Sequence, residues 1–287
     1  MQGTVDGFSY GLVTPLVAYA MACLGGALGL RCTTRSMLVP RSWRAGWLAL
    51  GSAAIGSGIW TMHFIAMMGF TVGRTPVRYD TPTMLAGLGV AVVMVGVGIF
   101  IVGYRGARGA ALFTGGAVTG LGIASMHYLG MAGLRLDGKL EYNTLTVAAS
   151  VVVAMIAATA ALWAAGQVRG FLWSVGASLV MGVAVSGMHY TGMAAVSVHL
   201  HPAAPVAPAA PPVALLAPLL LGPLVFLCLA GAVVLFDPMT VMGGPRRDPA
   251  AQRPGILSRA VPHPGARPAP RADRTAGHRR ARTPQNR

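Results

Sequence analysis

Seven apolar segments dominate the sequence and leave the backbone few choices of fold. Each is about 22 to 28 residues long, which is enough to cross the hydrocarbon core of a bilayer with some tilt. Lipid offers no hydrogen-bond partners, so outside a closed barrel only a helix satisfies its own backbone there. The segments run roughly over residues 8–30, 45–71, 83–104, 109–134, 144–166, 171–198 and 213–236. We therefore predict an all-α membrane protein with seven transmembrane helices.

The distribution of charge supports this class and divides the chain into three parts. Charged residues make up only 10% of the sequence, against about 25% in soluble domains. Of the net charge of +15, a large part lies in the arginine- and proline-rich residues 237–287. We expect a short N-terminal tail over residues 1–7, a membrane domain over residues 8–236 and a disordered cytoplasmic tail over residues 237–287. Such a basic tail favours anionic membrane lipid over nucleic acid as its partner.

The basic residues of the short connections predict the orientation. The first, third and fifth connections are the more basic ones, and they carry Arg31, Arg35, Arg41, Arg44, Arg105, Arg108 and Arg169. Cytoplasmic loops of membrane proteins are enriched in arginine and lysine. We therefore expect a multi-pass protein of the plasma membrane with its N-terminus outside and its C-terminus in the cytoplasm.

Three of the seven segments carry one repeated motif, Met-His-aromatic-x-small-Met. The copies occupy residues 62–67, 126–131 and 188–193, so their histidines are 64 and 62 residues apart. A histidine in hydrocarbon is costly and usually functional, and three copies at nearly equal spacing indicate an internal repeat. The copies fall on the second, fourth and sixth segments, all near the outer face. The fold should thus consist of three parallel two-helix repeats plus a seventh helix.

Each copy of the motif presents two kinds of metal ligand on one helix face. Residues four apart in a helix lie one turn apart on the same side, so each histidine has a thioether beside it. The candidate ligands are His63, Met67, His127, Met131, His189 and Met193, with Met62, Met126 and Met188 as possible additions. Thioether is a soft ligand that favours Cu(I), and imidazole also binds copper. The combination predicts copper, as Cu(I), in one or two sites.

Other interpretations of these residues remain open at this stage. Two of the histidines could ligate a haem iron axially. The histidines could also form hydrogen bonds between helices without any metal. Trp60, one turn before the first motif, is expected to anchor at the membrane interface. His199 and His201 are expected in a solvated outer loop.

On these motifs the chain resembles bacterial MHYT-domain proteins over roughly residues 8 to 236. The third copy spells Met-His-Tyr-Thr in full, whereas the first has Phe64 and Ile65 and the second has Leu129 at the variable places. The resemblance implies a seven-helix membrane sensor that binds copper and through it senses oxygen, carbon monoxide or nitric oxide. Many members carry a GGDEF, EAL or histidine-kinase domain after the membrane part.

The sequence favours a sensor over other functional classes. It contains no hydrolase, nucleotide-binding or kinase motif, so we expect no enzymatic activity. Because the last 50 or so residues are too few and too polar for an effector domain, a separate cytoplasmic signalling partner is expected. The alternatives are a copper transport or storage protein, and a haem-binding electron-transfer subunit. A transporter should show further ligands leading through the membrane, and no such series is evident.

The predicted orientation is testable with reporter fusions. Reporters placed at Arg105 and at the C-terminus should behave as cytoplasmic, and one at Pro205 should behave as external. The charge asymmetry of the connections is the physical reason. An external C-terminus would contradict the outer location of all three motifs.

Overall fold

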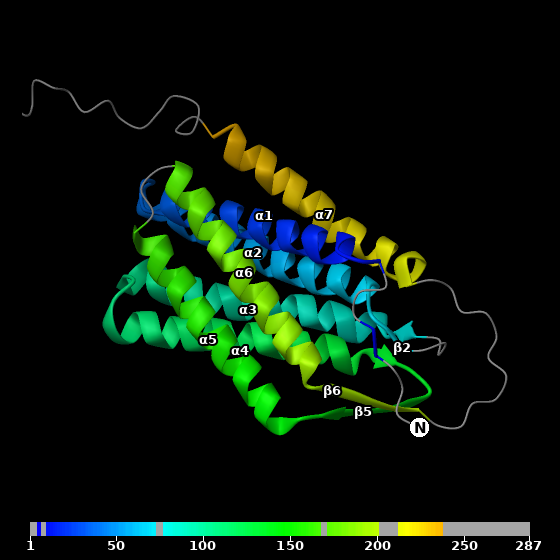
Figure 1. The fold of residues 1–287 in the computed structure, drawn as a ribbon. Helices are drawn as coiled ribbons and strands as arrows, with labels where there is room; N and C mark the ends of the chain where they lie inside the picture. Colours follow the sequence, from blue (N-terminus) through cyan, green and yellow to red (C-terminus); the bar gives the residue numbers. More distant parts are fainter. Residues whose placement is uncertain (1–4, 7–9, 73–76, 168–170, 201–211, 238–287) are drawn as a thin grey trace, which may run out of the picture. The chain divides into compact units, whose positions relative to one another are not determined.

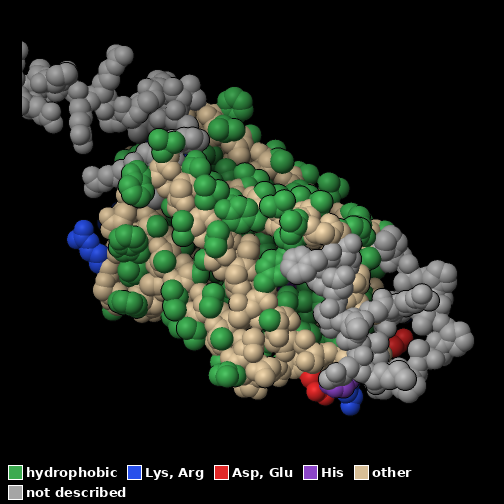
Figure 2. All heavy atoms as spheres, viewed as in Figure 1, with side chains coloured by type: hydrophobic (Ala, Val, Ile, Leu, Met, Phe, Trp, Pro, Cys, Tyr) green, Lys and Arg blue, Asp and Glu red, His purple; other side chains and the backbone are tan. Residues whose placement is uncertain are grey.

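The computed structural model describes residues 5–6, 10–72, 77–167, 171–200 and 212–237, and in them it confirms seven long helices (Figure 1). These are α1 Val13–Ser36, α2 Arg41–Met68, α3 Thr81–Arg105, α4 Gly109–Ala132, α5 Thr144–Gln167, α6 Phe171–Ala194 and α7 Pro212–Leu235. All seven are long and apolar enough to cross a membrane. On the face shown in Figure 2, hydrophobic side chains cover the middle and the coloured charged side chains lie near the two ends.

Six of the helices form a closed ring whose spacing is set by three equivalent glycines. Each lies seven residues before a motif histidine and presses against the first helix of the next repeat. The contacts are Gly56 with Val92 of α3, Gly120 with Met155 of α5, and Gly182 with Cys23 of α1. A methyl group at any of them would come within 2.5 to 2.8 Å of its neighbour. Because the third contact joins α6 back to α1, the three repeats close on themselves.

Short antiparallel strands fasten each two-helix repeat at the end that carries the motifs. β1 Val5–Asp6 pairs with β2 Thr71–Val72, β3 Arg78–Tyr79 with β4 Leu134–Arg135, and β5 Gly138–Tyr142 with β6 Val196–Leu200. In every case the strand before the first helix of a repeat pairs with the strand after the second helix. The predicted three repeats are therefore confirmed, each with the order strand, helix, helix, strand.

These strands correct the predicted ends of the motif helices. The second, fourth and sixth segments were expected to stay helical to residues 71, 134 and 198, but the helices end at Met68, Ala132 and Ala194. The residues that follow form the strand pairs, which satisfy the backbone by a ladder instead. Sequence periodicity missed them because each strand is only two to five residues long.

The first helix is also shifted from its prediction, by about one and a half turns toward the arginine-rich end. It runs to Ser36 rather than residue 30, and the Thr33 and Thr34 hydroxyls donate to carbonyls one turn earlier. Near its end, Arg35 Nε lies 2.8 Å from Asp237 Oδ2, and the Arg35 guanidinium stacks 5.7 Å from the centre of the Trp47 ring. Asp237, expected as the first tail residue, is thus buried against α1.

Helix α7 lies outside the ring and covers α1 and α2. Its buried Leu227, Ala230 and Val234 pack with Leu28 and Ala54. This cover makes α2 the most buried of the seven helices. The remainder of the predicted tail, residues 238–287, and the predicted outer loop over residues 201–211 lie outside the described residues.

Close contact between α1 and α2 should make Gly58 intolerant of any side chain. A methyl group there would lie 2.7 Å from the Gly25 Cα, so Gly58→Ala must push the helices apart. Overpacking of this kind costs about 1–3 kcal/mol. We expect a lower unfolding temperature for the purified variant in detergent. Gly46→Ala, on the same helix with nothing within 4 Å, is the matched control and should lose no stability.

Candidate metal centre

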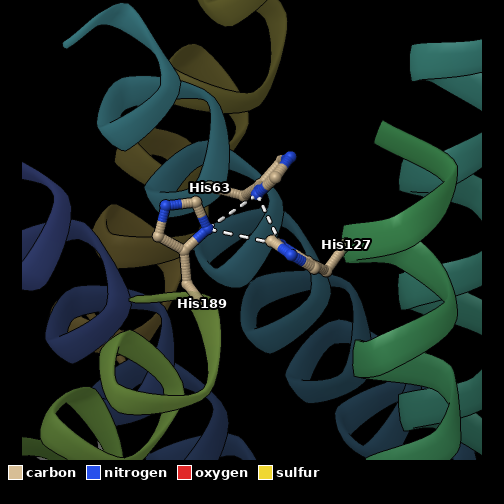
Figure 3. A group of neighbouring side chains, drawn as sticks. All are labelled: His63, His127 and His189. Atoms are coloured by element: carbon tan, nitrogen blue, oxygen red, sulfur yellow. Dashed lines mark hydrogen bonds between the residues drawn. The ribbon is translucent and has the colours of Figure 1, made fainter. Parts of the chain in front are cut away.

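Three histidines from the three repeats converge on one point between α2, α4 and α6 (Figure 3). The Nδ1 atoms of His63 and His189 are 3.0 Å apart, those of His63 and His127 are 3.2 Å apart, and those of His127 and His189 are 3.3 Å apart. The three side chains are at most 2% exposed. The predicted convergence of the motifs is therefore present, and it runs through the same ring nitrogen in each copy.

Three neutral imidazoles cannot satisfy one another in this arrangement. Each Nδ1 carries either one hydrogen or one lone pair in the plane of its ring. With three such atoms and only two states, at least one of the three pairs sets two lone pairs or two hydrogens against each other. Buried polar atoms left in this way are costly. A cation at the centre removes the conflict, because it accepts all three lone pairs at once.

The size of the triangle suits a transition-metal ion. The point equidistant from three nitrogens separated by 3.0, 3.2 and 3.3 Å is about 1.8 Å from each of them, whereas metal–imidazole bonds are about 2.0–2.1 Å. A small outward movement of the three rings would bring their nitrogens to the normal bonding distance from one ion. The described residues contain no carboxylate or thiol in this cluster.

The aromatic residue after each histidine orients its ring. Phe64, Tyr128 and Tyr190 meet the rings of the preceding histidines edge to face, with centroids 4.7 to 5.0 Å apart and interplanar angles of 77° to 79°. The Tyr128 hydroxyl is also within 2.6 Å of the Ser150 Oγ on α5. The three rings are therefore held alike, and phenylalanine serves as well as tyrosine for this contact.

The small residue at the fifth place of the motif makes room for the histidine of another repeat. A methyl group on Gly130 would lie 2.6 Å from the His63 Nε2, and one on Gly192 would lie 2.5 Å from the His127 Nε2. These two Nε2 atoms are buried, and the described residues offer them no hydrogen-bond partner. The two glycines thus limit how far the His63 and His127 rings can move away from the centre, which their Nδ1 atoms face. The sequence identified these two glycines only as the small residue of the motif.

The motif methionines divide into two layers on either side of the histidines. Met62, Met126 and Met188 are buried in the main core of the bundle. Met67 and Met131, one turn beyond the histidines, belong to a second cluster with the strand residues Val72, Leu134 and Val198, and the half-buried Met193 packs against it. Thioethers from all three repeats therefore lie in the layer that separates the histidines from the strands.

Two other residues that the sequence singled out have structural roles. Trp60 is fully buried and its Nε1 donates to the Met84 carbonyl at 2.9 Å, so the expected interfacial anchor is wrong. The tight packing of α2 against α3 draws the indole inside. His199 lies in β6 with its Nδ1 3.6 Å from a Glu141 carboxylate oxygen. His201 is outside the described residues.

The strands beyond the methionine layer carry a half-buried tyrosine, Tyr79, whose pKa is shifted. Tyr79 of β3 packs against both hydrophobic clusters, and burial raises the pKa of its hydroxyl. Beside it, Asp80 caps α3 by accepting from the Thr83 backbone N–H, and the Thr83 hydroxyl and N–H lower the pKa of this carboxyl. An apolar cluster thus lies between the level of the histidines and these strand residues.

Comparison with known proteins connects this geometry to a family. The model of the MHYT family, described as a bacterial signalling protein N-terminal repeat, matches residues 56–115, 120–178 and 182–241. These matches begin at the three glycines that close the ring. No solved structure matches the chain.

Several curated proteins are similar over the membrane part. The chain is 38% identical over 192 residues to the bifunctional diguanylate cyclase/cyclic di-GMP phosphodiesterase MucR of Pseudomonas aeruginosa, covering 65% of this chain and 28% of that protein. It is 34% identical over 214 residues to the cyclic di-GMP phosphodiesterase NbdA of the same organism, covering 68% and 26%. The signaling protein YkoW of Bacillus subtilis is 33% identical over 166 residues, covering 55% and 20%.

The chain thus spans between 20% and 28% of the length of these relatives. The repeat matches cover more than half of the chain, and each contains one histidine of the triad. The chain therefore belongs to the MHYT family, the membrane sensor domain of bacterial signalling proteins.

Proposed function

We propose that the histidine triad binds copper, as Cu(I), and that the bundle is a sensor that responds to a change at that ion. The observation that carries this proposal is the convergence of three buried Nδ1 atoms within 3.3 Å of one another. His63, His127 and His189 would hold the ion. Copper supplies a centre that binds diatomic gases or changes oxidation state, and the protein supplies its burial and its ligands.

The choice of copper rests on the second layer of donors. Imidazole alone suits zinc, copper, iron and nickel, whereas thioether favours Cu(I). Met67, Met131 and Met193 form a thioether layer one turn from the triad, where they can add a ligand or accept a second Cu(I). Haem fits less well, because a porphyrin must lie between its axial histidines and separations of 3.0 to 3.3 Å leave no gap.

The residues on the side of the triad away from the strands favour sensing over transport. One turn further into the bundle, the positions equivalent to the histidines are Ile59, Ile123 and Val185, all buried. These side chains offer no lone pair to a cation. Among the described residues that line the space below this level, Met181 is the one thioether, so no series of soft ligands leads an ion further inward. This suits a resident ion better than a passing one.

The signal and its output follow from the proposed orientation. We place the triad near the outer face, with oxygen, carbon monoxide or nitric oxide as the ligand class and the arginine-rich end in the cytoplasm. Sensing then requires two packings of the helices with different preferences for the occupied ion. The relatives named as cyclic di-GMP enzymes suggest such an enzyme, as a separate cytoplasmic signalling partner, for the output.

Substitution of the ligands should separate copper binding from simple helix packing. Replacing any one of His63, His127 or His189 by alanine should abolish stoichiometric Cu(I), as measured by metal analysis of purified protein after reconstitution. His199→Ala, outside the triad, is the control and should retain the ion. Met67→Leu and Met131→Leu keep volume but remove sulfur, so they should weaken Cu(I) more than Cu(II). Wild-type protein that binds no more copper than a triple-alanine variant would end the proposal.

The glycine behind a histidine provides a finer test of the geometry. Gly192→Ala should displace the His127 ring, because the added methyl meets its Nε2 at 2.5 Å. Outer-shell changes at metal sites typically cost about 10–100-fold in affinity, and we expect a loss in this range by competition with a Cu(I) chelator. Gly187→Ala, on the same helix with nothing within 4 Å, should bind copper as the wild type does. Equal affinities for the two variants would show that the ring position does not matter.

A further inference from the structure

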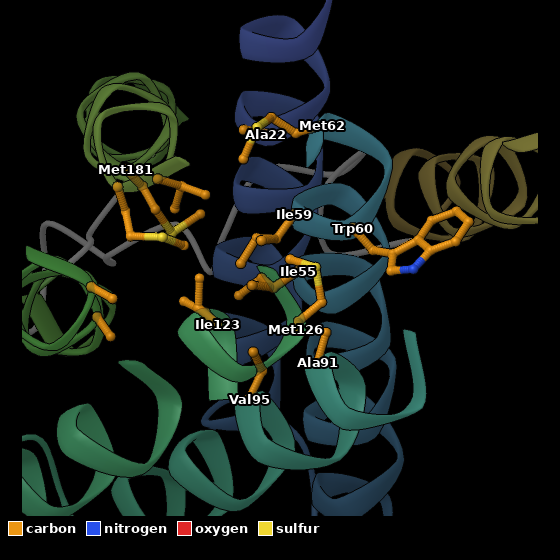
Figure 4. Close-up of a cluster of buried hydrophobic side chains, with 14 of the residues drawn as sticks. Ala22, Ile55, Ile59, Trp60, Met62, Ala91, Val95, Ile123, Met126 and Met181 are labelled. Atoms are coloured by element: carbon orange, nitrogen blue, oxygen red, sulfur yellow. The ribbon is translucent and has the colours of Figure 1, made fainter. Parts of the chain in front are cut away.

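A narrow cavity lies directly beneath the histidine triad, in the middle of the ring. Its volume is about 30 Å³. The residues one turn before the histidines, Ile59, Ile123 and Val185, line it, and so do those two turns before, which are Ile55, Thr119 and Met181. Figure 4 shows Ile55, Ile59, Ile123 and Met181 turned toward this shared space from α2, α4 and α6. The cavity thus begins where the triad ends.

The chemistry of the lining excludes most ligands. Apart from Thr33 and Thr119, its residues are aliphatic side chains and Met181. The Thr33 hydroxyl already donates to the Gly29 carbonyl, whereas the buried Thr119 Oγ1 has no hydrogen-bond partner among the described residues. A water needs about 10–15 Å³ and two to four polar partners, and apolar cavities stay dry but accept xenon. The space is therefore large enough for water, but its lining suits a small apolar molecule.

A groove on the surface leads to this cavity between α5 and α6. It has a volume of about 690 Å³ and is lined by alanines between the exposed Trp163 and Trp173. Ala157, Ala161 and Met181 line both the groove and the cavity, so they form the wall between them. The Met181 side chain is unbranched and flexible, and its methyl group lies against Gly26 of α1.

The third repeat is open at this place because its helices lack the close glycine contact of the other two. Gly25 and Gly58 bring α1 against α2, and Gly98 comes equally close to the Gly115 carbonyl between α3 and α4. On α6, Gly176 and Gly187 have nothing within 4 Å. The groove is consequently a property of the third repeat.

We propose that the cavity binds a small apolar molecule of the size of dioxygen or xenon, which enters from the hydrocarbon through the α5–α6 groove past Met181. Such molecules concentrate in lipid, and the groove faces it. The binding itself requires no metal. Its relevance to sensing rests on the proposed function, since the cavity would deliver the molecule to the inner side of the triad.

Xenon binding to the metal-free protein in lipid nanodiscs, followed by xenon NMR, tests the site. Ala158→Leu fills the cavity from α5, where Ala158 is buried, and should remove the bound-xenon signal. Ala149→Leu makes the same change at an exposed position of α5 and should keep it. Should Ala158→Leu fail to fold, Val185→Ile restores the isoleucine of the other repeats and should weaken binding. Val185→Ala should strengthen it, and Val183→Ile at an exposed position is the control.

The exchange rate tests the route separately. Ala164→Phe narrows the groove without lining the cavity, so xenon exchange should slow while equilibrium occupancy stays unchanged. An unaltered exchange rate would refute lateral entry. The site itself would be refuted if the wild-type protein gave no bound-xenon signal, or if that signal persisted in Ala158→Leu. Cu(I) binding, measured after reconstitution of a second portion of each preparation, keeps the two proposals apart. Copper without xenon binding would refute only this inference, and xenon binding without copper would refute only the metal site.

Discussion

Close contact between helices at glycine is the interaction on which the rest of this structure depends. Two lipid-exposed apolar helices gain little from burying side chains against each other, so they associate through packing at small residues. Gly56, Gly120 and Gly182 supply that contact from one repeat to the next, two turns before each histidine. Because each glycine lies the same number of residues before its histidine, the three histidines come to the same level. A single bulky residue at any of the three places would open the ring and separate the imidazoles.

In the closed ring, each position of the motif has its own structural role. The histidine points its Nδ1 to the centre, the following aromatic ring orients it, and the small residue receives the imidazole edge of another repeat. The methionine after it fills the layer under the strand cap. Every part of one repeat is thus completed by another, so no single two-helix unit contains a working site. This dependence makes the centre a sensitive reporter of helix packing, because a shift of one repeat changes the triangle of nitrogens.

The three repeats are not equivalent at their outer surfaces. Helix α7 covers the first repeat, and Asp237 at its end pairs with Arg35 beside Trp47. The third repeat is open between α5 and α6, where the groove approaches the cavity. In this nearly symmetric ring, the first repeat is thus covered by α7, and the third repeat carries a groove on its outer surface. Departures from symmetry of this kind allow one site to have a distinct input and a distinct output.

The amino-acid sequence alone determined the seven helices, the three repeats and the six principal candidate ligands, because helix formation in lipid and the spacing of four residues are local properties of the chain. The strand pairs after Met68, Ala132 and Ala194 were not predictable, since each is two to five residues long and exists only through a partner in the same repeat. Likewise, the sequence predicts Trp60 at the membrane interface, whereas its hydrogen bond to the Met84 carbonyl of α3 holds it inside the bundle. The tertiary structure decided the remaining features. These are the Nδ1 atom as the ring nitrogen that faces the centre, the contacts of Gly130 and Gly192 with the histidines, and the cavity beneath the triad. They depend on distances between side chains from different repeats, and no local pattern contains those distances.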